Sequence, residues 1–392
     1  MWLSEEQSAD KGVEAEHLRR LFGVFSATHG HGRSLVYEAL SRGVTGNDEL
    51  LALLMRTPRD QGRPSLLFAA VNSILAAHPD AALASYYPIH GGRRPVDHQL
   101  IPTFAAFCAE HGDELGHLLR TGSTQTNEIR RCAALRLALG HVSERWGEPV
   151  ALAEVGASAG LNLLLDRYRY RIGGREMTPA ADSPVVISCD LRGGTSADRL
   201  HRPLPKITSR LGIDMRPVSL SDPVDRAWLE AFIWPEDVDG LATLRGAMEL
   251  AVSTGVPPVV RGDAAADTAR LLADLPGSEP IVVFTASLLS YLGARSRAAF
   301  LNRLDEIAQR RPVAWAFAEA PGLVAATNVA VPALQGPLAK RNTLYLVGVS
   351  LRGHGRQDDG LLALADPYLR WLAPARQPAD DFQWLPAEPN AG

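Results

Sequence analysis

Apolar residues recur at helical spacing through the first part of the chain. Between Gln99 and Arg120 they lie three or four positions apart, at Ile101, Phe104, Phe107, Cys108, Leu115, Leu118 and Leu119. This spacing predicts one buried helix face, and the next segment repeats it with Ile129, Cys132, Leu135, Leu139 and Val142. The pattern predicts an all-helical N-terminal domain over residues 1–146.

After residue 146 the pattern changes to short apolar runs. They lie at 150–155, 184–189, 215–220, 258–261, 281–284, 313–318 and 343–351. Most are continuous and separated by helix-length segments, as is typical of parallel strands covered on both faces. The last run is followed closely by another at 360–365, which indicates an antiparallel hairpin. We therefore predict an α/β domain over residues 147–392, with a Rossmann-like, doubly wound, mostly parallel sheet and a closing hairpin.

Composition narrows the possible function classes. Hydrophobic residues make up 46% and charged residues 21%, which argues against a disordered or fibrous chain. With a net charge of −4 there is no general basic field, so DNA is not an expected partner. The cysteines are isolated, and we see neither a signal peptide nor an apolar run of membrane length. We expect a cytoplasmic protein without a membrane partner, and its oligomeric state stays open.

The segment after the first predicted strand carries the strongest chemical signal. The strand ends in an acid and is followed by small residues, where a ligand can approach the backbone closely. We expect this turn to open a helix whose first N–H groups face the ligand. The residues assigned to this binding turn are Glu154, Gly156, Ala157, Ser158, Gly160 and Asn162.

Two interpretations of this turn compete. Its acid-x-Gly-x-small-x-Gly pattern resembles the cofactor-binding turn of class I methyltransferases that use S-adenosylmethionine (SAM), with Ser158 in place of the usual glycine. The same residues match G-x-S-x-G, the nucleophile elbow of α/β-hydrolases. A hydrolase needs several strands before its elbow, whereas helices are predicted there. We favour the methyltransferase, and the alternatives are a tight structural turn or a hydrolase drawing on His201, His354, Asp263 and Glu319.

Acids after later strands complete the predicted cofactor site. Asp263 and Ala264 follow the strand at 258–261 and resemble the methyltransferase position that accepts from the adenine amino group. The alternative role for Asp263 is to cap the following helix. For the ribose hydroxyls we favour Asp190, which ends the strand at 184–189 after a hairpin-like insertion at 167–174. Asp214 is the competing candidate.

Hydroxyl and acidic residues near the last parallel strands are candidates for work on the methyl acceptor. The strand at 281–284 leads into Thr285 and Tyr291, which resemble the loop where methyltransferases bring donor and acceptor together. A satisfied helix start is the equally weighted alternative. Glu319 ends the strand at 313–318, at the edge of the sheet where ligands bind in open α/β folds.

Several motifs together resemble one bacterial family across nearly the whole chain. They are Gln125-Thr-Asn-Glu-Ile-Arg-Arg-Cys132, the turn with Asp166-Arg-Tyr-Arg-Tyr170, Ile233-Trp-Pro235 and Gly262-Asp-Ala264. The family is an uncharacterised domain of unknown function whose core is similar to class I methyltransferases. The resemblance also points to Tyr86, Tyr87, Asn127 and Glu128 as substrate or cofactor contacts from a helical lid. The plain alternative for Glu128 is an ion pair with Arg131.

These observations combine into one hypothesis. The chain is expected to be a SAM-dependent methyltransferase for an unidentified small molecule, or a SAM-binding subunit without catalysis. If the acceptor must lose a proton, the candidate bases are Glu128, Glu319 and Tyr291. No metal site is predicted, because His29 and His31 lie in a glycine-rich turn and His78 and His111 are isolated in sequence.

Overall fold

A computed structural model describes residues 5–55, 64–147, 149–177, 183–192, 200, 202–324, 344–353 and 356–375. The chain divides into two compact units. Unit 1 comprises Met1–Thr126 with Ser221–Arg245, and unit 2 comprises Asn127–Leu220 with Gly246–Gly392. Among the described helices, none is both long and apolar enough to cross a bilayer.

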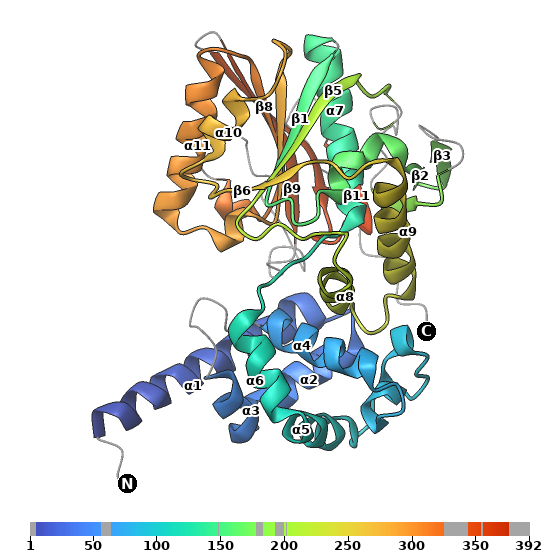
Figure 1. The fold of residues 1–392 in the computed structure, drawn as a ribbon, viewed down its shortest axis with the longest axis vertical. Coiled ribbons are helices and arrows are strands. Elements are labelled where there is room, and N and C mark those ends of the chain that lie inside the picture. The colour runs from blue at the N-terminus through green and yellow to red at the C-terminus, as the bar shows by residue number, and fades with distance from the viewer. Residues whose placement is uncertain are drawn as a thin grey trace. The chain divides into compact units, whose positions relative to one another are not determined.

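Unit 1 is built from helices, drawn largely in blue in Figure 1. They are α1 (Glu5–Phe25), the π-helical turn η1 (Ser26–Gly30), α2 (Leu35–Thr45), α3 (Asp48–Leu54), α4 (Pro64–Ala77), the 3₁₀ turns η2 (Ala82–Tyr86) and η3 (Pro88–His90), α5 (Leu100–Glu110), α6 (Gly112–Thr121) and α8 (Pro223–Ala231). Several start at N-cap side chains: Ser34 accepts from the Tyr37 amide and Asn47 from the Leu50 amide. Helix α9 (Val238–Thr254) runs from unit 1 into unit 2.

The division differs from the predicted boundary at residue 146 in two ways. The segment at 221–245 joins unit 1, because Trp228, Phe232 and Trp234 pack against its hydrophobic core. The side-chain amide of Asn72 also donates to the Ala231 carbonyl at 3.0 Å. In the opposite direction, α7 (Cys132–Trp146) belongs to unit 2, where it packs against the sheet. Such packing joins segments that are distant in sequence, so periodicity alone does not reveal it.

Unit 2 carries one mixed sheet of 11 strands. The strands are β1 (Val150–Val155), β2 (Arg169–Ile172), β3 (Arg175–Met177), β4 (Val186–Leu191), β5 (Ile207–Asp214), β6 (Val259–Arg261), β7 (Ile281–Ala286), β8 (Val313–Glu319), β9 (Tyr345–Gly353), β10 (Arg356–Ala365) and β11 (Trp371–Pro374). Their order is β3-β2-β4-β11-β10-β9-β8-β7-β1-β5-β6. The remaining helical elements are η4 (Ile129–Arg131), η5 (Leu161–Arg167), α10 (Thr268–Ala273), η7 (Leu289–Tyr291), α11 (Ala294–Ala308) and η8 (Pro321–Leu323).

The strands β6-β5-β1-β7-β8 form a parallel block with β1 at its centre. In chain order the block reads third, second, first, fourth, fifth, so the direction of winding reverses between β1 and β7. The predicted α/β sheet is thus confirmed, as is the hairpin, because β9 and β10 pair antiparallel. The prediction of a strand at 215–220 is wrong. The strand in this part of the chain is β5, which precedes the predicted range and ends at Asp214.

Alternation along β1 decides which face each side chain covers. Ala151, Ala153 and Val155 join the hydrophobic cluster that contains Phe300 and Leu304 of α11. Successive side chains point to opposite faces of a strand, so Glu154 faces the other side of the sheet. Figure 1 shows α10 and α11 on one side of the sheet and α7 on the other. Glu154 is therefore buried on the face of the sheet that α7 covers.

We predict that Gly212→Ala destabilises unit 2. Gly212 pairs with Glu154 on one side and Val259 on the other, and an added Cβ would lie 2.8 Å from the Ala157 Cβ and from a Val259 methyl group. Overpacking of this kind lowers the free energy of unfolding by about 1–3 kcal/mol. Urea unfolding followed by circular dichroism measures it. The control is Gly293→Ala, where no atom lies within 4 Å of the new Cβ; equal unfolding midpoints for the two variants would contradict the predicted crowding.

Candidate functional site

The turn after β1 is held in an unusual backbone conformation. Gly156, Ser158 and Gly160 have φ angles of 82°, 52° and 71°. Glycine adopts these left-handed values freely, whereas Ser158 carries a Cβ and is strained by about 1–3 kcal/mol. At Gly160 a Cβ would lie 2.8 Å from a Val259 methyl group, so this position needs glycine for space as well. Small residues in the turn are therefore required by its geometry.

The amides of this turn are bonded within the protein. Those of Gly156 and Ala157 donate to the Ile213 carbonyl at 2.8 and 3.2 Å. The Ser158 amide donates to Oδ2 of Asp214 at 2.8 Å. The expectation of open N–H groups at a helix start is therefore wrong for these amides, and the segment that follows is the 3₁₀ helix η5. Side chains around the turn, rather than its amides, supply the groups that can meet a ligand.

Glu154 is a buried acid at the carboxyl end of β1, with 3% of its surface exposed. Its Oε1 accepts from the Asn162 side-chain amide at 2.8 Å, and its Oε2 has no hydrogen-bond partner within the part of the chain that the structure describes. Burial raises the pKa of Glu154 to about 8, although Asn162 and Arg131 act to lower it. The carboxyl group is therefore largely protonated at neutral pH. Asn162, predicted as a cofactor contact, positions this acid.

Two further buried polar atoms beside the turn also have no hydrogen-bond partner among the residues that the structure describes. They are Oδ1 of Asn127 and Oγ of Ser158, on side chains that are 7% and 3% exposed. The Asn127 amide donates to the Ala157 carbonyl at 3.5 Å, which places Asn127 against the turn. Buried polar groups in folded proteins are rarely left without a partner, because each costs about 1–3 kcal/mol. Three such atoms around one turn indicate a place for a polar ligand.

A second strained serine follows the neighbouring strand β7. Ser287 has φ 62°, and its hydroxyl accepts from an Arg131 guanidinium nitrogen at 2.9 Å. The same hydroxyl lies 2.7 Å from the Tyr345 hydroxyl. Ser158 and Ser287 thus follow the two strands between which the winding reverses. In open α/β sheets the carboxyl edge at such a reversal is where ligands bind.

Glu319 adds a second buried acid at this edge. It ends β8, is fully buried, and accepts from the Leu288 and Leu289 amides at 3.0 and 3.3 Å. Burial raises the pKa of Glu319 to about 7, while these amides, Thr285 and Arg131 act to lower it. Because Arg131 also lowers the pKa of Glu154, one guanidinium acts on both acids. We call the set of side chains around the reversal between β1 and β7 the switch-point site. Its members are Asn127, Arg131, Glu154, Ser158, Asp214, Ser287 and Glu319.

The topology places the two candidates for the ribose acid, Asp190 and Asp214, in different parts of the sheet. Asp190 lies on β4, which five strands separate from β1 in the sheet order β4-β11-β10-β9-β8-β7-β1. Asp214 instead ends β5, the direct neighbour of β1. Its Oδ1 accepts from the Arg216 amide at 2.8 Å while Oδ2 holds the turn. Asp190 lies between β2 and β11 in the other half of the sheet, which the order of strands along the chain does not show.

Asp263 follows β6, on the outer side of β5. Its Oδ1 accepts from the amides of Ala265 and Ala266 at 2.9 and 2.8 Å, so the capping role expected as an alternative is present. Ala264 is buried in the hydrophobic cluster under α10 and α11. Asp263 therefore stands third in a row of acids, after Glu154 and Asp214, at the carboxyl ends of adjacent strands.

Other predicted residues have mainly structural partners. Glu128 caps η4 and forms an ion pair with Nε of Arg130 at 2.9 Å, next to Arg131, the partner proposed for it as an alternative. Thr285 is buried and accepts from the Trp315 indole at 3.1 Å. Tyr291 is 46% exposed in η7. Thr285 also forms a side-chain hydrogen bond with Glu319, which acts to lower the pKa of that acid.

The two predicted tyrosine contacts lie in the core of unit 1. The Tyr86 hydroxyl donates to Asp97 at 2.6 Å, and Tyr87 is fully buried. Their aromatic rings contribute to packing in this core, and the substrate contact predicted for them stays a prediction. The histidines considered for a hydrolase, His201 and His354, lie outside the described residues.

Sequence reasoning missed Tyr345, included Ser287 only as one of several hydroxyls after the strand at 281–284, and underweighted Arg131 and Asp214. Arg131 lies off the apolar stripe of its helix, which is a usable signal for a polar role. The contact of Arg131 with Ser287 joins residues 156 positions apart, and that of Ser287 with Tyr345 residues 58 apart. No local pattern predicts contacts over such separations.

Comparison with protein families gives one match. Residues 19–373 match the family described as "Uncharacterized protein conserved in bacteria (DUF2332)". The match covers most of the chain, so the protein belongs to this family. A search of curated proteins finds no significant match.

We predict that the stability of unit 2 falls as pH rises from about 4.5 to about 8, in part because of Glu154. The folded state keeps the proton of Glu154 up to a pKa of about 8, whereas the unfolded state loses it near the ordinary glutamate pKa of 4.5. The folded state then binds more protons in this window, so the free energy of unfolding decreases with pH. Glu154→Gln should flatten this slope and stabilise the protein at pH 8 by on the order of 1–3 kcal/mol.

Urea titrations at pH 5 and pH 8 test the sign. Glu319, whose pKa is raised in the same direction, leaves a smaller residual slope in the variant. The control is Glu306→Gln on the exposed face of α11. A slope that is the same in wild type and Glu154→Gln would show that Glu154 is ionised in the folded protein.

Proposed function

We propose that this protein is a SAM-dependent methyltransferase acting on a small molecule, with a Rossmann-like unit 2 that binds the cofactor. The observation that carries the proposal is the row of acids Glu154, Asp214 and Asp263 at the carboxyl ends of β1, β5 and β6, beside a tight turn of small residues. An adenosyl cofactor presents hydrogen-bond donors along its length. Acceptors on three neighbouring strands match that arrangement.

The unpartnered atoms near the turn fit the amino-acid end of SAM. Oε2 of Glu154 and Oδ1 of Asn127 are buried acceptors, and an ammonium group supplies the donors they lack. A cation at this point would also favour the ionised form of Glu154 and so lower its pKa from about 8. Asp214 would accept from the ribose hydroxyls and Asp263 from the adenine amino group.

When bound, the cofactor supplies a methyl group on a sulfonium, which is a good leaving group. The protein's residues then have to align the acceptor and exclude water. Glu319 is the proposed base, because its pKa of about 7 suits proton transfer at neutral pH. Arg131, Ser287 and Tyr345 form a hydrogen-bonded chain beside it that can orient an anionic or hydroxyl-bearing acceptor.

A hydrolase interpretation has one observation in its favour, the strained Ser158 in a G-x-S-x-G turn. However, the Ser158 hydroxyl is buried and has no hydrogen-bond partner among the described residues. Asp214 accepts a hydrogen bond from the Ser158 amide, not from this hydroxyl. A nucleophilic serine needs an adjacent base. A fluorophosphonate probe separates the two functions: the proposed methyltransferase remains unlabelled, whereas labelling that disappears in Ser158→Ala would establish the hydrolase.

We predict that calorimetry detects binding of SAM and S-adenosylhomocysteine, and that Asp214→Asn weakens it. Loss of the ribose acceptor charge should cost about 1–3 kcal/mol of binding free energy. Asn keeps one oxygen that can accept from the Ser158 amide, at the cost of the bond from the Arg216 amide, so circular dichroism of the variant is measured alongside its binding. Asp190→Asn is the matched control on β4 and should bind like wild type.

The outcome that contradicts the proposal is the absence of heat at millimolar SAM with the protein folded by circular dichroism. Equal losses in Asp214→Asn and Asp190→Asn would instead assign the ribose contact elsewhere. Incubation with isotopically labelled SAM and a metabolite extract then tests catalysis. Tight binding without any methylated product would identify a SAM-binding subunit that does not catalyse transfer.

A further inference from the structure

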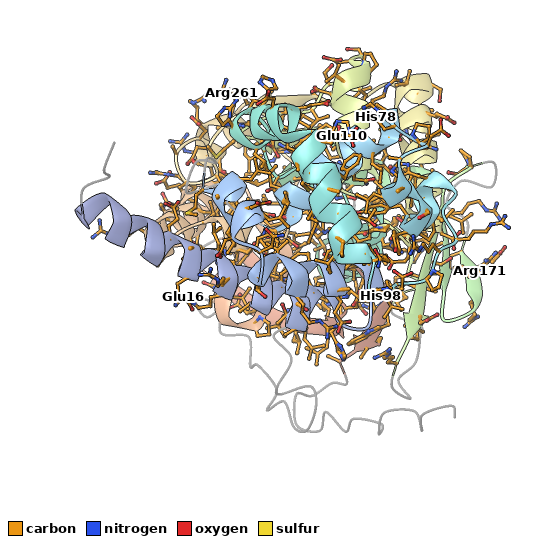
Figure 2. The ribbon with its side chains drawn as sticks, turned by 90° about the horizontal axis from the view of Figure 1, so that it is seen from below. Glu16, His78, His98, Glu110, Arg171 and Arg261 are labelled. Carbon is orange, nitrogen blue, oxygen red and sulfur yellow. The ribbon has the colours of Figure 1, made fainter. Side chains whose placement is uncertain are left out.

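Three metal-binding side chains meet in unit 1, apart from the switch-point site in unit 2. They are His78, His111 and Glu114, and one ligand atom from each lies within 4.8 Å of the others. His78 and His111 are isolated in sequence, as expected, and the tertiary structure brings them together. The segments that meet here are marked in Figure 2 by His78 and by Glu110, the residue before His111.

The fold of unit 1 holds the backbones of these residues firmly. His78 directly follows α4, and its amide donates to the Leu75 carbonyl at 3.0 Å. His111 is the junction of α5 and α6: its amide donates to Phe107 at 3.1 Å and its carbonyl accepts from Leu115 at 2.9 Å. Glu114 lies in the first turn of α6. Helices α4 and α6 pack together, which brings the two segments into contact.

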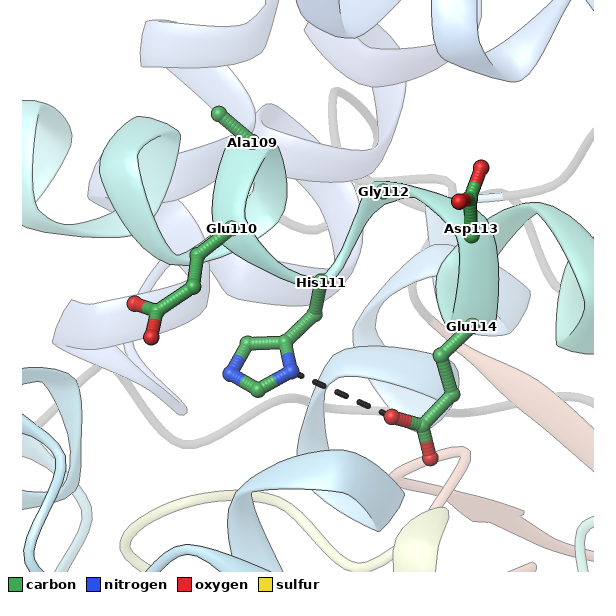
Figure 3. Close-up of a pocket in the computed structure, with 6 residues that line it drawn as sticks. All are labelled: Ala109, Glu110, His111, Gly112, Asp113 and Glu114. Carbon is green, nitrogen blue, oxygen red and sulfur yellow. Dashed lines mark ion pairs between the residues drawn. The ribbon is translucent and has the colours of Figure 1, made fainter.

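Ring packing and charge orient the side chains toward one another. The rings of His78 and His111 lie 4.6 Å apart, and that of His111 lies 4.4 Å from the buried ring of Phe107. Oε2 of Glu114 lies 3.9 Å from Nδ1 of His111, as the dashed line in Figure 3 shows. Phe107 thus supports one imidazole, while the second imidazole and the carboxylate converge on it.

The surroundings favour a cation. A pocket of about 340 Å³ lies at the junction of α5 and α6, and its lining includes Glu110, Asp113 and Glu114 together with His111 (Figure 3). Carboxylates lining a pocket raise the local concentration of cations. Two adjacent imidazoles repel each other when both are protonated, whereas a shared metal ion binds both in their neutral form.

We propose that His78, His111 and Glu114 form a binding site for a divalent transition metal ion, and that this ion is Zn²⁺. Two imidazoles and one carboxylate are a donor set that Zn²⁺ uses with a fourth, open position, whereas Mg²⁺ and Ca²⁺ take oxygen ligands. Bonds of about 2.0–2.1 Å require the donor atoms to approach more closely than they do here. The exposed side chains of His78 and Glu114 are free to turn inward around the supported His111.

A metal ion at this point would join the end of α4 to the α5–α6 junction. Metal that binds only the folded state stabilises it by mass action, so the melting temperature should rise with Zn²⁺ concentration. Isothermal titration of the full chain, purified without a histidine tag, should give one Zn²⁺ per chain in this site. Co²⁺ in its place should show the visible absorption of a four-coordinate ion.

Variants at the exposed ligands test the assignment without disturbing the core. His78→Ala and Glu114→Gln should each weaken Zn²⁺ binding by roughly tenfold or more and abolish the thermal shift. Two variants serve as matched controls. His117→Ala removes an exposed histidine from α6, the helix that carries Glu114, and Asp113→Asn neutralises the neighbouring acid of the pocket. Both should bind like wild type. No Zn²⁺ binding by the folded wild type, or equal affinity in all four variants, would overturn the proposal.

Discussion

The hydrogen bond from the Ser158 amide to Asp214 is the interaction on which the geometry of the switch-point site depends. It joins the turn after β1 to the end of β5, and with the Ile213 carbonyl it occupies the amides of that turn. The strained φ of Ser158 is tolerated because these bonds hold the turn from the neighbouring strand. Glu154, which directly precedes the turn, is buried, and burial raises its pKa. One of its carboxyl oxygens has no hydrogen-bond partner among the described residues.

The site combines two buried acids with one guanidinium. Glu154 and Glu319 are both removed from water, and Arg131 lowers the pKa of each without returning it to its ordinary value. Because the cation is shared, binding of a further positive group beside Glu154 would change the electrostatics at Glu319 as well. The proposed cofactor and the proposed base are in this way coupled by charge.

Unit 1 is stabilised differently, by a large aromatic and aliphatic core to which the segment at 221–245 contributes.

Much of the fold was predictable because it is written in local patterns. The strand runs at 150–155, 281–284 and 313–318 are nearly continuous apolar segments, and buried parallel strands require such segments. The turn after β1 was predictable because its left-handed positions demand small residues. The prediction of a strand at 215–220 failed because the position of a strand depends on which segments pair across the sheet. The place of Asp190 in the sheet and the division of the chain into units depend on such pairing and packing too. That choice is made by long-range contacts.

The sequence by itself determined the α/β class of the second part, the helical character of the first, the family, and Glu154 with its turn, because periodicity and steric demands act over a few residues. Only the tertiary structure decided that Asp214 stands beside the turn, that Arg131 reaches Ser287, and that His78 meets His111. These contacts join positions that no local pattern relates. They form because burying the two faces of a sheet and the stripe of a helix brings distant segments together.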